Sequence, residues 1–134
     1  MIDQDIRWQQ RFNHFEKSFS LLRDAILIET PSVIERAGLI QFFEMAFELA
    51  WKLLKDFEEA EGFTVTSPRD AIKKAFAAGV INQGHDWIDA LEDRNLTTHT
   101  YNEETAQAVE EKIRTRYFPL LQQLHHEFSA KASR

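Results

Sequence analysis

Residues 39–54 read LIQFFEMAFELAWKLL, and this stretch decides the fold. Its only polar side chains are Gln41, Glu44, Glu48 and Lys52, at successive spacings of 3, 4 and 4 residues. On a helix this spacing produces one narrow polar stripe along a cylinder that is otherwise apolar. Such a helix is buried on most sides, and one small bundle can hardly cover so much apolar surface. We therefore expect part of this helix to face a second copy of the chain.

The segment before this stretch predicts one long helix over residues 3–29. Pro31 ends it, because the residue before a proline is disfavoured in the helical conformation. Ser32 and Glu35 then form a capping-box pattern that starts the next helix, which we expect over residues 33–61, ended by Gly62. Apolar residues recur in the first helix at spacings typical of a bundle seam: Trp8, Phe12, Phe15, Phe19, Leu22 and Ile26.

A short third helix is predicted where Ser67, a capping residue, precedes Pro68 at the first helical position. It should stop near Gly79. The side chains expected to point inward from it are Ala71, Ile72, Ala75 and Phe76.

Two further helices complete the chain. The fourth begins around His85 and runs to Arg94, and the fifth runs from the N-cap Asn102 to about residue 130, with a bend expected at Pro119. Their inward side chains are expected to be Trp87, Ile88, Leu91, Val109, Ile113, Tyr117, Leu120, Leu124 and Phe128.

Length and composition indicate one all-α domain over residues 1–134. The chain has 134 residues, 4 Gly, 3 Pro and no Cys, which fits a reducing, cytoplasmic environment and argues against a disulfide framework. It has neither a signal-peptide pattern nor an uncharged apolar run of ~18 residues, so we expect no membrane span. An antiparallel bundle of four longer helices with one short extra helix is the most economical packing.

The net charge of −6 argues against indiscriminate nucleic-acid binding, which depends on neutralising phosphates. A small basic cleft is still compatible with that charge, although a solvated helix face is the simpler interpretation of the same cations. The residues concerned are Arg69, Lys73 and Lys74, with Lys52, Lys55 and Arg94 as residues that could join them in space.

The most reactive stretch is residues 94–101, which read RNLTTHTY. Arg94 is a forked cation that matches a phosphate, His99 can carry a proton near neutral pH, and the Tyr101 hydroxyl can carry a modification. On a regular helix Arg94 and His99 would be about 140° apart, so they converge only if the helix loosens or ends. The alternative is that Arg94 pairs with Glu44 or Glu48 while His99 caps a helix end.

A metal site is not expected from the remaining histidines. His125 and His126 are adjacent and point to different faces of one helix. His14 and His85 have no carboxylate or histidine at ligand spacing. We therefore expect no metal and no cofactor.

The chain as a whole resembles the HepT-like branch of the HEPN superfamily, whose members are often called nucleotidyltransferase substrate-binding proteins. The resemblance covers roughly residues 8–125, and its motifs are ordered along the whole chain. They are Phe43-Glu44, residues 48–55 (ELAWKLLK), Ser67-Pro68-Arg69, Ala75-Phe76, Trp87, Arg94-Asn95 and His99-Thr100-Tyr101.

This resemblance implies a HEPN-like up-and-down four-helix bundle that forms a symmetric homodimer. It implies a metal-independent endoribonuclease toxin whose Arg94 and His99 act on RNA at the dimer interface. It also implies a minimal nucleotidyltransferase, encoded as a separate chain, that acts as antitoxin by transferring AMP onto Tyr101, as in type VII-like pairs. Supporting roles for Asn95, Glu44 and Glu48 around Arg94 are hypotheses from the residues.

Two other functions are compatible with the same residues. The chain can be a non-catalytic subunit that holds a substrate or nucleotide for its nucleotidyltransferase. It can also be a purely structural helical dimer. Growth arrest on expression of the chain alone would favour the toxin.

Overall fold

The computed structural model describes residues 2–94 and 102–132. The regular elements in those ranges are all helical, which confirms the predicted all-α class. They are α1 (Ile2–Ile26), α2 (Val33–Ala60), α3 (Pro68–Ala77), α4 (Gly84–Asp93), α5 (Glu103–Lys112), the π-helical turn η1 (Ile113–Tyr117) and α6 (Phe118–Ala132). Because α5, η1 and α6 follow one another directly, they form one continuous rod.

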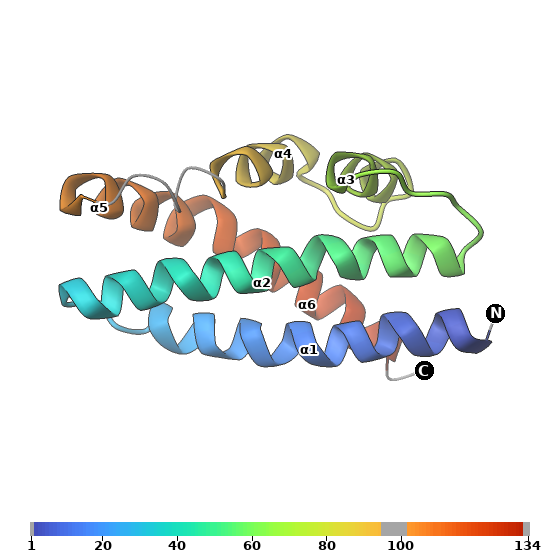
Figure 1. The fold of residues 1–134 in the computed structure, drawn as a ribbon, viewed down its shortest axis with the longest axis horizontal. Helices are drawn as coiled ribbons and strands as arrows, with labels where there is room; N and C mark the ends of the chain where they lie inside the picture. Colours follow the sequence, from blue (N-terminus) through green and yellow to red (C-terminus); the bar gives the residue numbers. More distant parts are fainter. Residues whose placement is uncertain (1, 95–101, 133–134) are drawn as a thin grey trace.

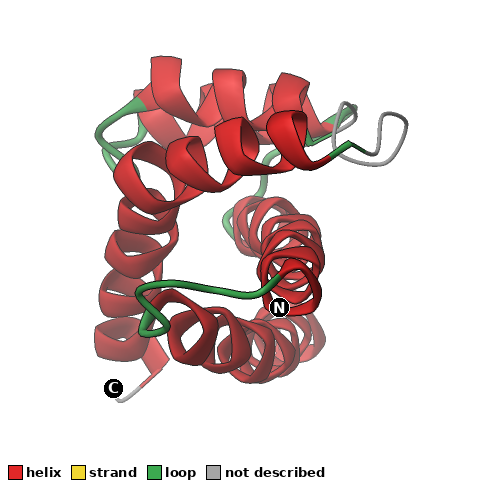
Figure 2. Ribbon diagram, turned by 90° about the vertical axis from the view of Figure 1, so that its left-hand side faces the viewer, coloured by secondary structure: helices red, strands yellow, loops and turns green. Residues whose placement is uncertain are grey.

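Helices α1 and α2 lie side by side and run in opposite directions along the long axis of the molecule (Figure 1). The rod α5–η1–α6 crosses them, so that α5 contacts α2 whereas α6 contacts both α1 and α2. Helices α3 and α4 pack together on the other side of α2 from α1 (Figures 1 and 2). Helix α2 is therefore the central element. No helix in the described ranges is long and apolar enough to cross a membrane.

The predicted helix starts are confirmed by their hydrogen bonds. The Ser32 hydroxyl accepts from the backbone N–H of Glu35 (3.1 Å), and the Glu35 carboxylate accepts from the backbone N–H of Ser32 (2.9 Å). This is the full capping box. Ser67 and Asn102 each accept from the backbone N–H three residues further on, at 3.0 and 2.7 Å.

The core is built from the predicted apolar seams and is rich in stacked aromatic rings. Phe19 of α1 stacks on Phe118 of α6 with ring centres 5.5 Å apart, and Phe43 of α2 stacks on Tyr117 of η1 at 5.7 Å. Ring pairs of this kind add to the free energy gained from burial. From the predicted seam of α1, Trp8, Phe12, Phe15, Phe19 and Leu22 are buried and Ile26 is partly buried.

One predicted core residue is not in the core. Phe76 is 53% exposed, whereas Ala71, Ile72 and Ala75 are fully buried as expected. The ring of Phe76 lies against Gly84 at the start of α4, where a Cβ would come within 3.0 Å of it. Phe76 therefore covers the outside of the α3–α4 contact and does not enter the bundle.

A π-helical turn lies just before Pro119, the residue at which a bend was expected. Residues Ile113–Tyr117 form η1, and α6 begins at Phe118. Proline has no N–H to donate to the carbonyl four residues before it, and a π turn is one way in which a helix accommodates such a defect. Tyr117, the last residue of this turn, stacks on Phe43 of α2.

Candidate functional site

Arg94 is the one residue of the predicted motif that lies within the described part of the chain. It caps the C-terminus of α4, where its backbone N–H donates to the carbonyl of Ala90 (3.0 Å). Its guanidinium donates to one carboxylate oxygen of Glu48 on α2, and the other oxygen of Glu48 accepts from the indole N–H of Trp51 (3.0 Å). Glu48 is thus held by two donors and in turn orients Arg94.

The remaining motif residues, Asn95, His99 and Tyr101, lie outside the described residues. Their convergence with Arg94 therefore stays a prediction. Of the two carboxylates offered as partners for Arg94, Glu48 makes a hydrogen bond to it. Glu44 lies one helical turn earlier on α2 and is partly exposed.

Both helices that flank residues 95–101 are tied to α2 by ion pairs. At the end of α4, Arg94 binds Glu48. On α5, the guanidinium of Arg36 binds Glu103 in the first turn and Glu110 in the last turn, the latter at 2.7 Å. Arg36 and Glu48 are twelve residues apart on α2, which corresponds to about 18 Å along the helix. Arg94 and Glu103, which flank residues 95–101, are therefore both held by side chains of the same helix, α2.

The second of these anchors is part of a larger network. The buried carboxylate of Glu110 also accepts from Arg114 (2.7 Å), and Arg114 donates to the carbonyls of Ile26 and Ile28 at 2.7 Å each. Burial opposes the ionised form of Glu110, but hydrogen bonds from Arg36 and Arg114 outweigh it and lower the pKa of this carboxyl. This network was not predictable from sequence spacing, because Arg36 and Glu110 are 74 residues apart.

Asp93, immediately before Arg94, anchors a second set of contacts. Its carboxylate accepts from the hydroxyl of Tyr117 and lies 3.4 Å from the ammonium of Lys112. Burial, followed by the hydrogen bond to Asp93, raises the pKa of the Tyr117 hydroxyl, so this group stays protonated and donates. Next to these groups is a cavity of about 190 Å³, which is lined by Phe43, Asp93, Thr105, Ala108, Val109, Lys112, Ile113 and Tyr117.

The basic cluster suggested by the sequence is largely neutralised. Arg69 pairs with Glu92 at 3.1 Å, Lys74 with Asp70 at 2.7 Å and Lys55 with Glu59 at 3.3 Å. These pairs support a solvated, charge-balanced surface over a basic cleft. The expectation that His85 has no carboxylate at ligand spacing is wrong, because its Nε2 lies 3.7 Å from Asp89, one helical turn later. Within the described ranges there is nevertheless no group of three or more His, Asp or Glu side chains that could hold a metal ion.

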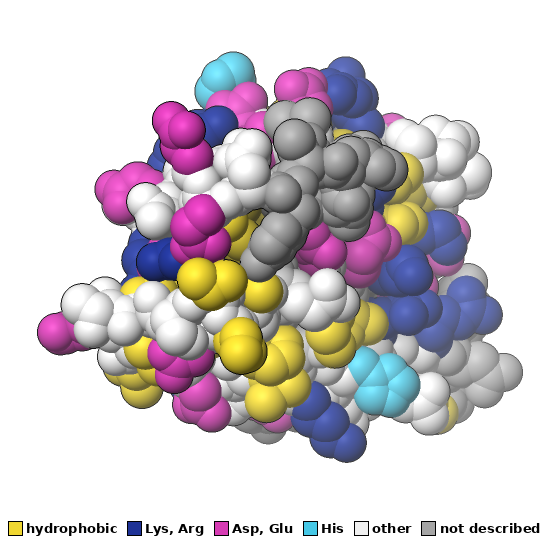
Figure 3. Space-filling model, turned by 60° about the vertical axis from the view of Figure 1, so that its left-hand side comes forward, with side chains coloured by type: hydrophobic (Ala, Val, Ile, Leu, Met, Phe, Trp, Pro, Cys, Tyr) yellow, Lys and Arg dark blue, Asp and Glu magenta, His cyan; other side chains and the backbone are white. Residues whose placement is uncertain are grey.

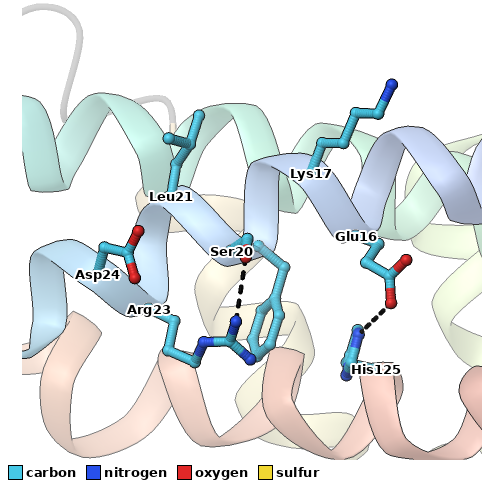
Figure 4. A pocket seen from close by; sticks show the side chains of 8 residues that line it. Glu16, Lys17, Ser20, Leu21, Arg23, Asp24 and His125 are labelled. Carbon is cyan, nitrogen blue, oxygen red and sulfur yellow. Dashed lines mark hydrogen bonds and ion pairs between the residues drawn. The ribbon is translucent and has the colours of Figure 1, made fainter.

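His125 lies in a shallow hollow between α1 and α6 (Figure 4). Its ring stacks on Phe19 at 4.8 Å, and its Nε2 lies 3.0 Å from the carboxylate of Glu16. In the same hollow, Arg23 donates to the Ser20 hydroxyl (3.0 Å) and lies over the Phe19 ring. Both basic groups are therefore engaged by α1, and this arrangement explains His125 as a packing residue.

Exposed apolar side chains gather at the end of the molecule where α1 turns into α2. Ile34 is 84% exposed, Leu27 74%, Val33 53%, Leu21 44% and Met45 40%. Figure 3, in which this end comes forward, shows hydrophobic side chains grouped on the lower part of the face. Within residues 39–54, where uncovered apolar surface was expected, Met45 is the one large apolar side chain that is exposed. The single bundle covers the rest of that stretch, so the expected uncovered surface is much smaller than the sequence indicated.

Comparison with known proteins places these features in a family. Residues 10–130 match the family model described as nucleotidyltransferase substrate binding protein like. A protein of Haemophilus influenzae described as a probable ribonuclease HepT is 29% identical over 106 residues, which are 75% of this chain and 66% of that protein. This chain thus spans a little under two-thirds of that relative's length.

A crystal structure of a Thermus thermophilus protein is similar throughout. It has a TM-score of 0.77 and 32% identity, and the alignment covers 90% of this chain and 99% of that one. The helices of this chain are therefore arranged in space much as in that solved structure. Because the family model spans nearly the whole chain, this protein belongs to the nucleotidyltransferase substrate binding protein-like family and is a HepT-like member of the HEPN superfamily.

Proposed function

We propose that this protein is a metal-independent endoribonuclease of a toxin–antitoxin pair. Its relative from Haemophilus influenzae is described as a probable ribonuclease, and its family is named for nucleotidyltransferases. The observation that carries the proposal is the position of Arg94. A guanidinium that is 20% exposed sits at the end of α4, oriented by Glu48, directly before the segment that contains His99.

The chemistry required of such a site matches these residue types. Without a metal, the 2′-hydroxyl of RNA attacks the adjacent phosphate, the 5′-oxygen leaves, and a 2′,3′-cyclic phosphate remains. The site must take the proton from the 2′-hydroxyl, give one to the leaving oxygen and stabilise the phosphoryl oxygens. His99 serves as the proton carrier and Arg94 as the cation on the phosphate.

A symmetric homodimer completes the site in this proposal. One histidine cannot act as base and acid in the same step, whereas a two-fold axis brings two copies of His99 and Arg94 together. The exposed side chains of Ile34 and Met45 on α2 supply apolar surface for such an interface.

Tyr101 is the proposed site of control. A minimal nucleotidyltransferase, the antitoxin, transfers the adenylyl group of ATP to its hydroxyl, which loses its proton, and pyrophosphate leaves. The attached group adds a negative phosphodiester and a bulky nucleoside two residues from His99, so it competes for Arg94 and blocks RNA. Tyr101→Phe should then remain toxic and escape neutralisation by the nucleotidyltransferase, as followed by growth and by peptide mass spectrometry of residue 101.

Cleavage of total RNA by the purified protein tests the proposal. Arg94→Ala and His99→Ala should each abolish cleavage, while Arg69→Ala, which removes an exposed arginine paired with Glu92, should leave it unchanged. EDTA should have no effect, and the products should carry cyclic phosphates. Activity that is lost with EDTA and restored by magnesium would contradict the mechanism.

The second candidate is a non-catalytic subunit that binds substrate or nucleotide for the nucleotidyltransferase. The family name itself favours it. In that case the purified protein leaves RNA intact, and expression of the chain alone, as wild type or as Tyr101→Phe, does not arrest growth.

A further inference from the structure

The cavity beside Asp93 combines an apolar interior with a polar mouth. Phe43, Ile113 and Tyr117 form its inner wall, and each is at most 2% exposed. Val109 is partly buried on the same wall, and Ala108 lies exposed at the mouth. An apolar cavity that opens between a few charged groups is the usual form of a small-molecule site.

The size of the cavity limits what it can hold. Its volume is about 190 Å³, whereas sites that enclose a whole drug-sized ligand are about 300–1,000 Å³. One planar ring system therefore fits, and a sugar or phosphate attached to that ring stays outside. The rings of Phe43 and Tyr117 stack on each other, so they close the inner end of the cavity with apolar surface and a base would not lie between them.

The polar groups at the mouth match the edge of a nucleobase. The Asp93 carboxylate can accept hydrogen bonds from exocyclic amino groups, and the Lys112 ammonium, 3.4 Å from it and half-exposed, can donate to ring nitrogens and carbonyls. Tyr117 holds the carboxylate of Asp93 through its hydroxyl, which fixes the acceptor before any ligand binds.

The cavity also lies next to the candidate phosphate group. Asp93 at its mouth is followed directly by Arg94. On α2, Phe43 lines the cavity and Glu48, which binds Arg94, comes five residues later, about 7.5 Å along the helix and about 140° around it. The closer link is the step from Asp93 to Arg94, about 3.8 Å between Cα atoms, so a base in the cavity and a phosphate on Arg94 can belong to one nucleotide.

We propose that this cavity is a nucleobase subsite, which holds the base of a nucleotide whose phosphate lies on Arg94. The proposal deepens the proposed ribonuclease function and rests on it for the role of Arg94. The base comes from one of two sources with the same chemistry: an RNA substrate, or the adenylyl group carried by Tyr101. In the first case the cavity selects which nucleotide precedes the cleaved bond, and in the second it retains the inhibitory group.

Ligand-observed NMR with the four nucleoside 3′-monophosphates tests the subsite without any need for cleavage. Saturation transferred from the protein should be strongest on the base protons of at least one nucleotide. Val109→Phe fills the cavity and should weaken the Kd about tenfold or more. Ile88→Phe, the same kind of change in the apolar groove between α3 and α4, should leave the Kd within about twofold.

A second variant controls for the possibility that Val109→Phe loses binding because it misfolds. Ala108→Trp covers the mouth from an exposed position of α5 and should reproduce the loss with unchanged helix content by circular dichroism. If both variants bind the nucleotides as wild type does, or if saturation is strongest on the ribose, the subsite is refuted. Nucleotide binding that responds to both variants in a chain that leaves RNA intact would support the subsite and refute the ribonuclease.

Two further measurements separate the sources of the base. If RNA supplies it, cleavage of dinucleotides by the wild type should prefer one 5′ base, and Val109→Phe should remove that preference. If the adenylyl group supplies it, only the adenosine nucleotide should bind, and the chain modified on Tyr101 should no longer bind it.

Discussion

Glu48 of α2 receives the guanidinium of Arg94 on one carboxylate oxygen and the indole N–H of Trp51 on the other. Because Trp51 lies one turn further along the same helix, it fixes the rotamer of Glu48, and Glu48 then fixes the direction of Arg94. The arginine is therefore positioned before any phosphate arrives. Preorganisation of this kind is where a site gains most of its electrostatic effect.

Glu48→Gln should therefore reduce RNA cleavage, with a lower kcat at nearly constant KM. The amide keeps the size of the side chain but loses its charge, so Arg94 is held less firmly, and misplacement by about 1 Å can cost on the order of 100-fold in rate. We expect a loss of about 10- to 100-fold, less complete than for Arg94→Ala. Glu92→Gln, at an exposed ion pair with Arg69, is the control. Unchanged kcat in Glu48→Gln would show that Glu48 does not position Arg94.

Arg36→Ala should destabilise the fold, since Arg36 joins α2 to two carboxylates of α5, one in its first turn and one in its last. The variant leaves the buried carboxylate of Glu110 with Arg114 as its cation. We expect a fall in Tm of about 5 °C in a thermal melt at neutral pH. Arg69→Ala removes an exposed pair and should shift the Tm by less than about 1 °C. Equal shifts in the two variants would contradict the special role of the Arg36 network.

Local signals made much of the fold predictable. The caps at Ser32, Ser67 and Asn102 act within three residues of themselves, so sequence alone was sufficient to find them. The position of Phe76 was not predictable in this way. It depends on the close approach of Gly84 from α4, and helical spacing contains no information about that contact.

The candidate site was predictable to a smaller extent. Glu44 and Glu48 share one face of α2, four residues apart, and spacing alone did not single out the hydrogen bond between Glu48 and Arg94. The Arg36–Glu110 pair and the Tyr117–Asp93 hydrogen bond join residues 74 and 24 positions apart. Such contacts depend on how the rod α5–η1–α6 crosses α2, which is a property of the packed molecule.

Met45→Glu tests the proposed homodimer. Met45 is 40% exposed on α2, and a carboxylate placed there would be buried without a partner in the proposed interface. Wild type should sediment at twice the 15.7 kDa chain mass and the variant as a monomer without RNase activity. Phe76→Glu, at a residue 53% exposed on the α3–α4 side, should remain dimeric. A wild-type chain that is monomeric at micromolar concentration would remove the composite site.

Glu58→Gln should change how stability depends on pH. Glu58 is 4% exposed near the end of α2, and neither of its carboxylate oxygens has a hydrogen-bond partner among the described residues. Burial raises the pKa of this carboxyl to about 8, and the nearby Lys74 opposes the shift only in part. The carboxyl is therefore protonated in the folded protein at neutral pH.

The sign of the effect follows from proton binding. The unfolded chain releases this proton near the ordinary pKa of a glutamic acid, about 4.3, so between that pH and 8 the folded state binds more protons and stability falls as pH rises. At about 1.4 kcal/mol for each pKa unit, the loss between about pH 4.5 and pH 8.5 is on the order of 4 kcal/mol. Urea unfolding at both pH values should show this loss in wild type and in Glu59→Gln, whose carboxylate pairs with Lys55. It should be largely absent in Glu58→Gln, and a variant with the same pH slope as wild type would mean that Glu58 is ionised in the folded protein.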